Sequence, residues 1–267
     1  MQNISIKNNK LGYLSLIVAS TLFIGCGSSS SSGPAKNSGT GDIDMASYYP
    51  SKNITKTYTT VEGNTTDFTP GTYSDAITVV KENNITTITT TDEDGDNEKV
   101  IIDDKNITQI SDGLNFSSYR HVNLGDTFFK LQDKETEEMK QSGLDYATVT
   151  KELNLECTID EQLKEFKKGE HKYSGDILKI KCIDNGKLTI DVNPAIVALA
   201  PEMFKDINGT HDNYDVSYHY FKKGMGEVAS IDDDCILVSK EPKWQNDREQ
   251  ECIEKYHDYE YYVEPKK

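Results

Sequence analysis

Residues 83–103 read NNITTITTTDEDGDNEKVIID, and this stretch decides the fold class. Two runs rich in Ile, Thr and Val flank a turn of Asp, Gly and Asn, a pattern typical of a β-hairpin. Similar short runs of Val, Ile, Thr and Tyr alternate with turn clusters from Tyr48 to the C-terminus. This alternation predicts an all-β fold, an antiparallel meander that forms a curved open sheet, a sandwich or a barrel.

Two turns and one helical turn are expected between the strands of this pattern. Residues 184–186, Asp-Asn-Gly, predict a tight turn, and the charged residues 135–141 predict a helical turn on the surface. The three acids at 232–234 predict a hairpin tip. The expected strands cover residues 53–61, 76–80, 85–91, 99–103, 107–110, 116–122, 127–131, 146–158, 163–166, 176–183, 187–192, 216–221, 228–231, 236–239 and 256–263.

One segment favours a helix. Asn193 is suited to cap a helix, Pro194 suits the first helical position, and the following AIVALA is apolar. Pro201 should end this helix and begin a second short one over residues 202–207. We therefore expect one or two short helices that cover one end or one face of the sheet.

The first 25 residues have the layout of a secretory signal. Basic residues precede an apolar run over residues 11–25, which is too short to span a bilayer comfortably as a helix. The run ends in LFIGC, residues 22–26, which resembles a bacterial lipobox, with Phe23 and Ile24 in place of the commonest residues. The resemblance implies cleavage before Cys26 and lipidation of Cys26. The alternative is an ordinary signal peptide followed by a chance cysteine.

A Ser/Gly-rich segment over residues 26–45 follows the signal and is expected to be a flexible tether. In bacterial lipoproteins a residue other than Asp after the cysteine implies the outer membrane, and Gly27 fits that pattern. Residues 46–267 are expected to form one all-β domain, with a sub-boundary near residue 143 as the alternative.

The net charge of the chain limits the classes of partner that it is expected to bind. Its 267 residues include 45 acidic and 29 basic side chains, which give a formal net charge of −16. This balance argues against nucleic-acid binding, because phosphate contacts need clustered Lys and Arg. Anionic lipids would repel the chain as well, so acyl chains rather than a basic patch are expected to hold it at the membrane.

Four cysteines remain after Cys26 is assigned to the anchor. An even number of cysteines in an exported chain predicts two disulfides, and three pairings are open. We favour the nearest-neighbour pairing, Cys157–Cys182 and Cys235–Cys252, because Cys157 and Cys182 lie in two neighbouring strand-like runs. A zinc site is the rival interpretation, and it lacks the close cysteine spacing that zinc sites use.

Three segments resemble bacterial envelope lipoproteins built on long, curved antiparallel sheets. They are YHYFKKGMGEVASIDDDC at 218–235, YYPSKNITKTYT at 48–59 and GDTFFKL at 125–131. In those proteins an aromatic strand leads through a glycine turn into an apolar strand. The resemblance implies the same curved sheet here and carries no activity with it.

Two groups of polar residues are candidate metal sites. Asp92, Asp94 and Asp96 occupy the first, third and fifth positions of a loop that resembles a calcium loop, although the later positions do not fit and the flanks are strands. An acidic hairpin tip is the favoured interpretation. The second group is His211, Asp212, Asp215 and His219, which lie close in sequence, and its histidines are expected to be ordinary surface or strand histidines.

One pattern predicts a modification. Asn64, Asn84, Asn106 and Asn208 each head an Asn-x-Thr sequon and follow an acidic residue two positions earlier. This extended sequon is similar to the acceptor of bacterial N-glycosylation systems, which requires an exposed, bendable loop. The alternative is that Asp, Asn and Thr are simply the residues that hairpin turns use.

The sequence contains no Gly-x-Ser-x-Gly elbow and no Gly-rich phosphate loop, so it predicts no catalytic residue and no cofactor. The leading hypothesis is a lipid-anchored envelope protein with a non-catalytic role in binding an apolar ligand or a protein partner. The alternatives are a structural or surface-interaction lipoprotein without a small-molecule site and an uncharacterised envelope hydrolase. The expected partners are the membrane, through the lipid anchor, and an apolar ligand or an envelope protein, with no nucleic acid.

Overall fold

The structure is a computed structural model that describes residues 31–32, 39–63, 71–111, 114–141, 144–168, 171–204, 208–237 and 258–263. Strands make up most of these residues, which confirms the predicted all-β fold. None of the helices in these ranges is long and apolar enough to cross a bilayer.

Thirteen of the described strands form one antiparallel sheet. Their order is β1-β10-β11-β12-β13-β14-β15-β3-β4-β5-β6-β7-β8, so β15, the last of the described strands, joins the two halves of the sheet. The bounds are β1 Ser31–Ser32, β3 Ile54–Gly63, β4 Thr72–Glu82, β5 Ile85–Thr91, β6 Asn97–Ile102, β7 Asn106–Ser111, β8 Leu114–Tyr119, β10 Thr127–Gln141, β11 Leu144–Lys168, β12 His171–Val192, β13 Gly209–Lys222, β14 Gly226–Leu237 and β15 Asp258–Val263.

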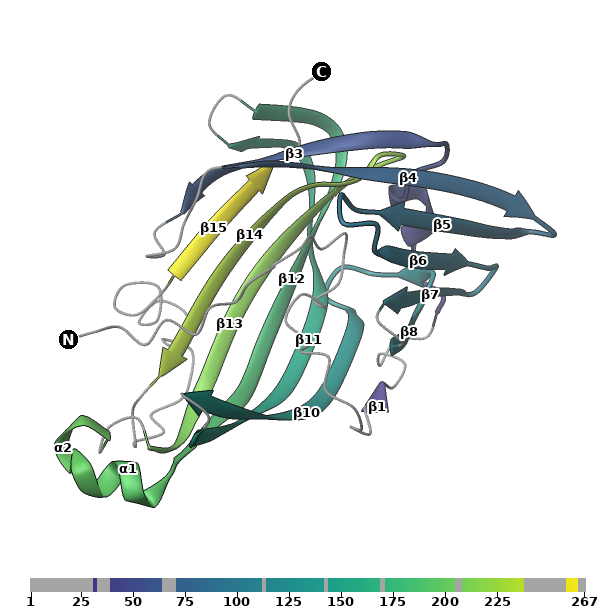
Figure 1. Cartoon of the computed structure of the whole chain (residues 1–267). Coiled ribbons are helices and arrows are strands. Elements are labelled where there is room, and N and C mark those ends of the chain that lie inside the picture. The colour runs from purple at the N-terminus through teal and green to yellow at the C-terminus, as the bar shows by residue number, and fades with distance from the viewer. Residues whose placement is uncertain are drawn as a thin grey trace.

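The sheet curls so that its two ends approach each other (Figure 1). β8 at one end of the order contacts β10 and β1 at the other end. No ladder joins these ends in the described strands, so the sheet is curved and open, which is one of the predicted forms. A small second sheet pairs β2 (Ile43–Asp44) with β9 (His121–Val122).

One apolar core lies between the two halves of the curled sheet. It takes buried side chains from β4 to β8 on one side and from β10 to β13 on the other. A short 3-10 helix, η1 (Met45–Tyr48), adds Met45 and Tyr48, and Tyr49 follows it into the same core. The core and the β10–β11 ladder therefore extend across the alternative sub-boundary near residue 143.

An ion pair holds η1 against the sheet. Arg120 donates from Nε and Nη2 to the two carboxylate oxygens of Asp44, at 2.7 and 2.8 Å. Asp44 in turn caps η1 by accepting a hydrogen bond from the Ala46 N–H at 3.1 Å. The Arg120 hydrogen bond lowers the pKa of Asp44. These contacts attach residues 43–45, at the end of the expected tether, to the folded body.

Bulges let neighbouring residues enter the core together. A register shift in the β10–β11 ladder lies at Phe128, and both Phe128 and Phe129 are buried. A second shift, in the β13–β14 ladder, accompanies the burial of both Val228 and Ala229. Successive residues of a regular strand face opposite sides, so both pairs depend on the extra residue of a bulge.

The predicted helical turn at residues 135–141 is wrong, because these residues continue β10. They pair with β11 from Gln141 opposite Leu144 to Glu135 opposite Lys151. Within the described residues, the outer edge of this segment has no ladder partner. Charged side chains on an edge strand oppose pairing with another chain. The dense Glu and Lys thus belong to an edge strand.

The predicted tight turn at residues 184–186 is also wrong, because β12 runs straight through it. Asp184 accepts a hydrogen bond from the Asn154 N–H at 2.8 Å, across the ladder to β11. A Cβ on Gly186 would lie 1.9 Å from the Glu152 carbonyl oxygen, so only glycine fits there. In this protein the Asp-Asn-Gly sequence allows β12 to lie close to β11.

The predicted hairpin tip at residues 232–234 is wrong for a similar reason. These residues lie inside β14, where they pair with Ser217, Val216 and Asp215 of β13. On the other side they pair with residues 258–260 of β15. The acids therefore lie in the middle of the sheet.

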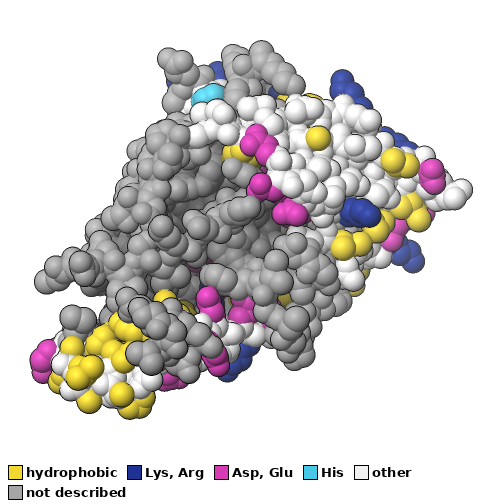
Figure 2. Space-filling model, viewed as in Figure 1, with side chains coloured by type: hydrophobic (Ala, Val, Ile, Leu, Met, Phe, Trp, Pro, Cys, Tyr) yellow, Lys and Arg dark blue, Asp and Glu magenta, His cyan; other side chains and the backbone are white. Residues whose placement is uncertain are grey.

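The helical connection after β12 follows the prediction. α1 (Pro194–Leu199) is capped by the Asn193 side chain, which accepts from the Ala195 N–H at 3.0 Å, and α2 (Pro201–Phe204) begins at the expected proline. Ile196 and Val197 pack inward with Phe204 against the ends of the strands. The connection protrudes at one end of the sheet (Figure 1), and hydrophobic side chains gather over it (Figure 2).

Candidate functional site

Five side chains form a polar group beside the apolar core, and we call them the buried polar network, although Ser217 is only half-buried. They are Lys56, Tyr58, Ser217, His219 and Glu227, from β3, β13 and β14. Lys56 and His219 are each 1 % exposed and Glu227 is 3 % exposed. Burying charged groups costs free energy unless they are paired or hydrogen-bonded, so each contact in the network matters.

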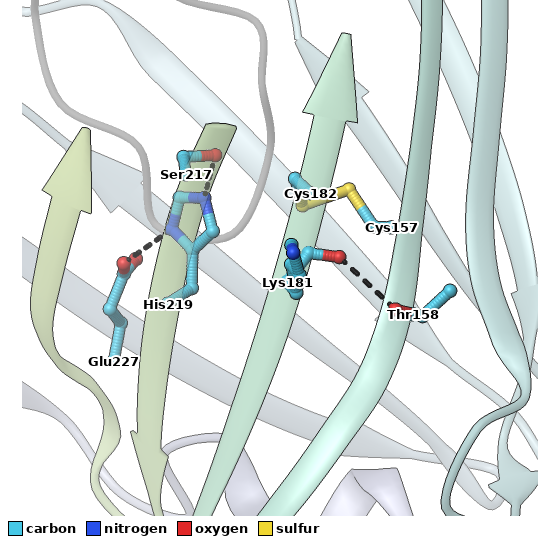
Figure 3. The surroundings of a disulfide bond; sticks show 7 residues. All are labelled: Cys157, Thr158, Lys181, Cys182, Ser217, His219 and Glu227. Carbon is cyan, nitrogen blue, oxygen red and sulfur yellow. Dashed lines mark hydrogen bonds and ion pairs between the residues drawn. A yellow bond between two sulfur atoms is a disulfide. The ribbon is translucent and has the colours of Figure 1, made fainter. Parts of the chain in front are cut away.

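His219 lies between Ser217 and Glu227 (Figure 3). Its Nε2 is 3.0 Å from the Ser217 Oγ, and its Nδ1 is 2.8 Å from the Glu227 Oε1. Both ring nitrogens are therefore engaged. Ser217 is the ladder partner of Cys182, so this group lies beside the Cys157–Cys182 disulfide.

Lys56 and Tyr58 secure the backbone of β14 next to Glu227. The Tyr58 hydroxyl donates to the Glu227 carbonyl oxygen at 3.0 Å, and the Lys56 ammonium donates to the same oxygen. Lys56 also donates to the Tyr58 hydroxyl at 3.0 Å. The Tyr73 ring stacks on Tyr58 with centroids 4.9 Å apart. The network therefore binds β3 and β14 together, although β15 separates them in the sheet.

Gly226 permits this close approach. Its φ is +82°, in the left-handed region that favours glycine. A Cβ at this position would lie 3.0 Å from Pro50 Cδ and 3.3 Å from Lys56 Nζ. A larger residue would push Lys56 away from the Glu227 carbonyl.

Asp75 is a second buried acid beside the network. It is 3 % exposed and is the cross-strand partner of Lys56 in the β3–β4 ladder. Its Oδ1 is buried with no hydrogen-bond partner. Burial raises the pKa of Asp75 to about 7, although the positive charge of Lys56 opposes this shift. Asp75 therefore changes charge near neutral pH.

Tyr49 closes the network on the side of η1. Burial, and secondarily the negative charge of Glu227, raise the pKa of Tyr49 far above its ordinary value. Its hydroxyl accepts a hydrogen bond from Gln109 Nε2 at 3.3 Å, and its ring lies 6.2 Å from the Phe221 ring. The phenol stays neutral and fills the space beside Glu227.

A smaller polar pair lies further along β12 and β13. The Asp184 Oδ2 accepts from Asn213 Nδ2 at 3.1 Å, and both residues are buried. Burial raises the pKa of Asp184, while its hydrogen bond from the Asn154 N–H counteracts that effect. The inner face of β12–β13 thus changes from apolar at Ile180 to polar at Asp184.

Ser217, His219 and Glu227 are arranged like the nucleophile, the general base and the orienting acid of a hydrolase. In such a relay the carboxylate orients the imidazole, and the second ring nitrogen accepts the serine proton. Both distances are within the required range. Hydrolysis also needs donors for an oxyanion. Ser217 lies between Cys182 and Asp232 in the sheet, where the backbone N–H groups serve the ladders.

The sequence did not single out most of this network. His211 and His219 were expected to be ordinary strand histidines, and both are buried in β13. Lys56, Asp75 and Glu227 were missed. A usable signal exists, because two-residue alternation places Lys56 on the buried face with Tyr58, and Asp75 with Tyr73. A charged residue at a core position is a departure that marks a special site.

Metal binding gains no support from the described residues, in which no group of three or more His, Cys, Asp or Glu is placed to hold an ion. Asp92, Asp94 and Asp96 lie at the tip of the β5–β6 hairpin. The Asp92 Oδ1 accepts from the Asp94 and Asp96 N–H groups at 3.0 and 2.9 Å. This carboxylate thus stabilises its own turn.

The predicted glycosylation sites differ in their surroundings. Asn84 is exposed in the two-residue turn between β4 and β5, with φ of +64°. Asn106 is half-buried, and the exposed Asn208 accepts a hydrogen bond from the Val192 N–H at 2.8 Å. Asn64 lies outside the described residues. Glycosylation at these positions stays a prediction, and Asn84 is the position that best fits an exposed loop.

One predicted disulfide is present. Cys157 and Cys182 are joined, and they are ladder partners in β11 and β12. The second predicted pair, Cys235–Cys252, lies in part outside the described residues because Cys252 is not described. Cys26, the predicted lipidation site, lies outside them as well.

No protein-family model, curated protein or solved structure matches this chain.

Proposed function

We propose that this chain is a lipid-anchored protein of the bacterial outer membrane with a non-catalytic binding role towards a protein partner. The anchor would be the acylated Cys26, within the lipobox-like LFIGC that follows the apolar run of the signal. The acidic chain would depend on acyl chains for membrane attachment, because anionic lipids repel its net charge of −16.

The packing of the described core is the observation that favours a protein partner over an apolar ligand. A carrier of apolar ligands needs a hollow lined by apolar side chains. Here Met45, Tyr48 and Tyr49 enter the space between the two halves of the sheet and pack with the core side chains. Within the described residues, these side chains of the chain itself cover apolar surface that a ligand would otherwise contact.

Replacing Cys26 by Ser tests the anchor. We expect the wild-type chain to incorporate labelled palmitate and to sediment with membranes, and Cys26→Ser to do neither. A Cys235→Ser variant is the matched control, since it removes a cysteine without touching the lipobox. Labelling that persists in Cys26→Ser would contradict the anchor.

Lipid analysis of the exported Cys26→Ser chain tests the partner class. Because Met45, Tyr48 and Tyr49 pack into the described core, we expect organic extraction to release no lipid in stoichiometric amount. One lipid per chain would overturn the choice of a protein partner and restore the apolar-ligand hypothesis. This measurement is independent of whether Cys26 is acylated.

A second candidate function is hydrolysis, which the Ser217–His219–Glu227 relay favours. A working relay would make Ser217 reactive towards a fluorophosphonate probe and towards aryl esters, and Ser217→Ala would abolish both. Ser230→Ala is a suitable control, because Ser230 pairs with His219 in the β13–β14 ladder. We expect that the probe labels neither the parent chain nor the Ser230→Ala variant, because the three side chains only stabilise the fold. Labelling of both that is lost in Ser217→Ala would establish a hydrolase.

A further inference from the structure

We propose that the outer face of α1 is a membrane-contact surface that inserts into a zwitterionic lipid bilayer. The starting observation is that α1 is apolar on every side. Ile196 and Val197 pack inward, while the outer face presents Pro194, Ala195, Ala198 and Leu199 to solvent. Leu199 is 85 % exposed, the highest value among the large hydrophobic residues that the structure describes. A helix that is hydrophobic all round is ordinarily buried.

The position of α1 suits insertion into a surface. It follows the end of β12 and, with α2, projects beyond the strands at one end of the sheet (Figure 1). Hydrophobic side chains cover this projection in the space-filling view (Figure 2). An apolar patch on an acidic protein marks a site of interaction. A protruding tip enters a fluid phase more readily than it fits a second rigid surface.

The composition of the patch selects a bilayer over a protein. Specific protein interfaces take roughly 20 to 30 residues a side and are enriched in Tyr, Trp and Arg. The stretch Pro194–Leu199 contains only Pro, Ala, Ile, Val and Leu, and it is far smaller than such an interface. Insertion into the boundary between headgroups and acyl chains needs no complementary partner surface.

Charge selects the type of lipid. No charged residue occurs from Pro194 to Pro201, whereas Asp191 precedes the helix and Glu202 follows it. These acids oppose a surface of anionic headgroups and tolerate a zwitterionic one. The choice of a bilayer also rests on the proposed function, because a lipid on Cys26 would keep the domain next to a membrane.

The test uses the full chain carrying Cys26→Ser, exported so that its disulfide forms, and a tryptophan placed at the tip. Leu199→Trp is compared with Leu124→Trp, because Leu124 is 54 % exposed and lies outside the helical connection. The emission of the parent chain, which contains one Trp, is subtracted. With phosphatidylcholine vesicles, we expect the emission of Trp at 199 to shift to the blue and to be quenched by brominated lipid. Trp at 124 should do neither.

A charge at the tip gives a second measurement. Because the burial of the Leu side chain is lost, Leu199→Glu should lower the partition constant between vesicles and water at least about tenfold. Leu124→Glu should leave it unchanged, and vesicles rich in phosphatidylglycerol should bind the parent chain less well. If the emission wavelength of the tryptophan in Leu199→Trp does not change when vesicles are added, the proposal is wrong. An emission that shifts with protein concentration alone would also overturn it, in favour of a second copy. Because the chain carries no anchor, failure of the Cys26 proposal cannot produce either result.

Discussion

Replacing Asp75 by Asn is expected to stabilise the protein strongly at pH 8 and to change its stability little at pH 4. Burial raises the pKa of Asp75 to about 7 in the folded state, from an ordinary value of 3.8. The folded state therefore binds a proton that the unfolded state releases between these two values. The free energy of unfolding falls as the pH rises from about 4 to about 7, and the loss persists above pH 7.

The expected size of this effect follows from the shift in pKa. Each pKa unit corresponds to about 1.4 kcal/mol, so the ionised Asp75 costs of order 4 kcal/mol at pH 8. Asn keeps the shape of the side chain and removes the charge. Urea unfolding followed by circular dichroism at both pH values measures the difference. Asp96→Asn, at an exposed hairpin tip, is the control and should show no such dependence. Equal effects of Asp75→Asn at pH 4 and pH 8 would contradict this account.

Removing the Cys157–Cys182 disulfide is expected to lower the free energy of unfolding by about 3 to 4 kcal/mol. The bridge closes a loop with a sequence separation of 25, and in the chain-entropy model such a loop restricts the unfolded chain by this amount. The double variant Cys157→Ala/Cys182→Ala should keep its far-ultraviolet spectrum. Ladder pairs on both sides of the bridge, Glu156 with Ile183 and Thr158 with Lys181, remain in place.

The matched control is Thr150→Ala/Thr189→Ala, which removes the side chains of another ladder pair in the same two strands. It should cost much less than the cysteine variant. Thermal and urea unfolding under oxidising conditions provide the comparison. Equal stability of the cysteine variant and the wild-type chain would mean that the ladder alone already restricts this segment.

The sequence predicted the local elements well where turn residues or prolines bound a short run of one propensity. β5 begins and ends at the predicted residues, because Ile85 to Thr91 is a regular β-prone run between two turn clusters. The cap at Asn193 and the prolines at 194 and 201 likewise identified the helices. These signals act over a few residues and do not depend on the rest of the fold.

Predictions failed where a distant strand determines the conformation. Asp184-Asn185-Gly186 has the composition of a turn, yet Asn154 and Glu152 of β11 fix it as part of a strand. Residues 135–141 have the composition of a surface helix, and pairing with β11 overrides that preference. Local composition carries no information about which strand lies alongside.

The buried polar network shows the same limit. Lys56 and Glu227 are far apart in the sequence, and only the curled sheet brings the ammonium to the Glu227 carbonyl oxygen. The two-residue alternation of β3 could have shown that Lys56 faces the interior. It could not have shown that Lys56 contacts the Glu227 carbonyl oxygen there. The Ser217–His219 contact is local, since the two residues lie on the same face of one strand, and Glu227 completes it from the next strand.

The place of β15 in the sheet affects when this protein can finish folding. Thr59 and Thr60 of β3 pair with Val263 and Tyr262, so the ladder between the two halves needs β15. Because a chain is synthesised with its amino terminus first, that edge of β3 stays open until residues 258–263 have emerged. Contacts between residues so distant in sequence form slowly. A chain without β15 would keep the β3–β4 and β13–β14 ladders but would expose one edge of β3 and one edge of β14. Exposed strand edges invite aggregation and proteolysis, so the short strand β15 protects the two longer strands beside it.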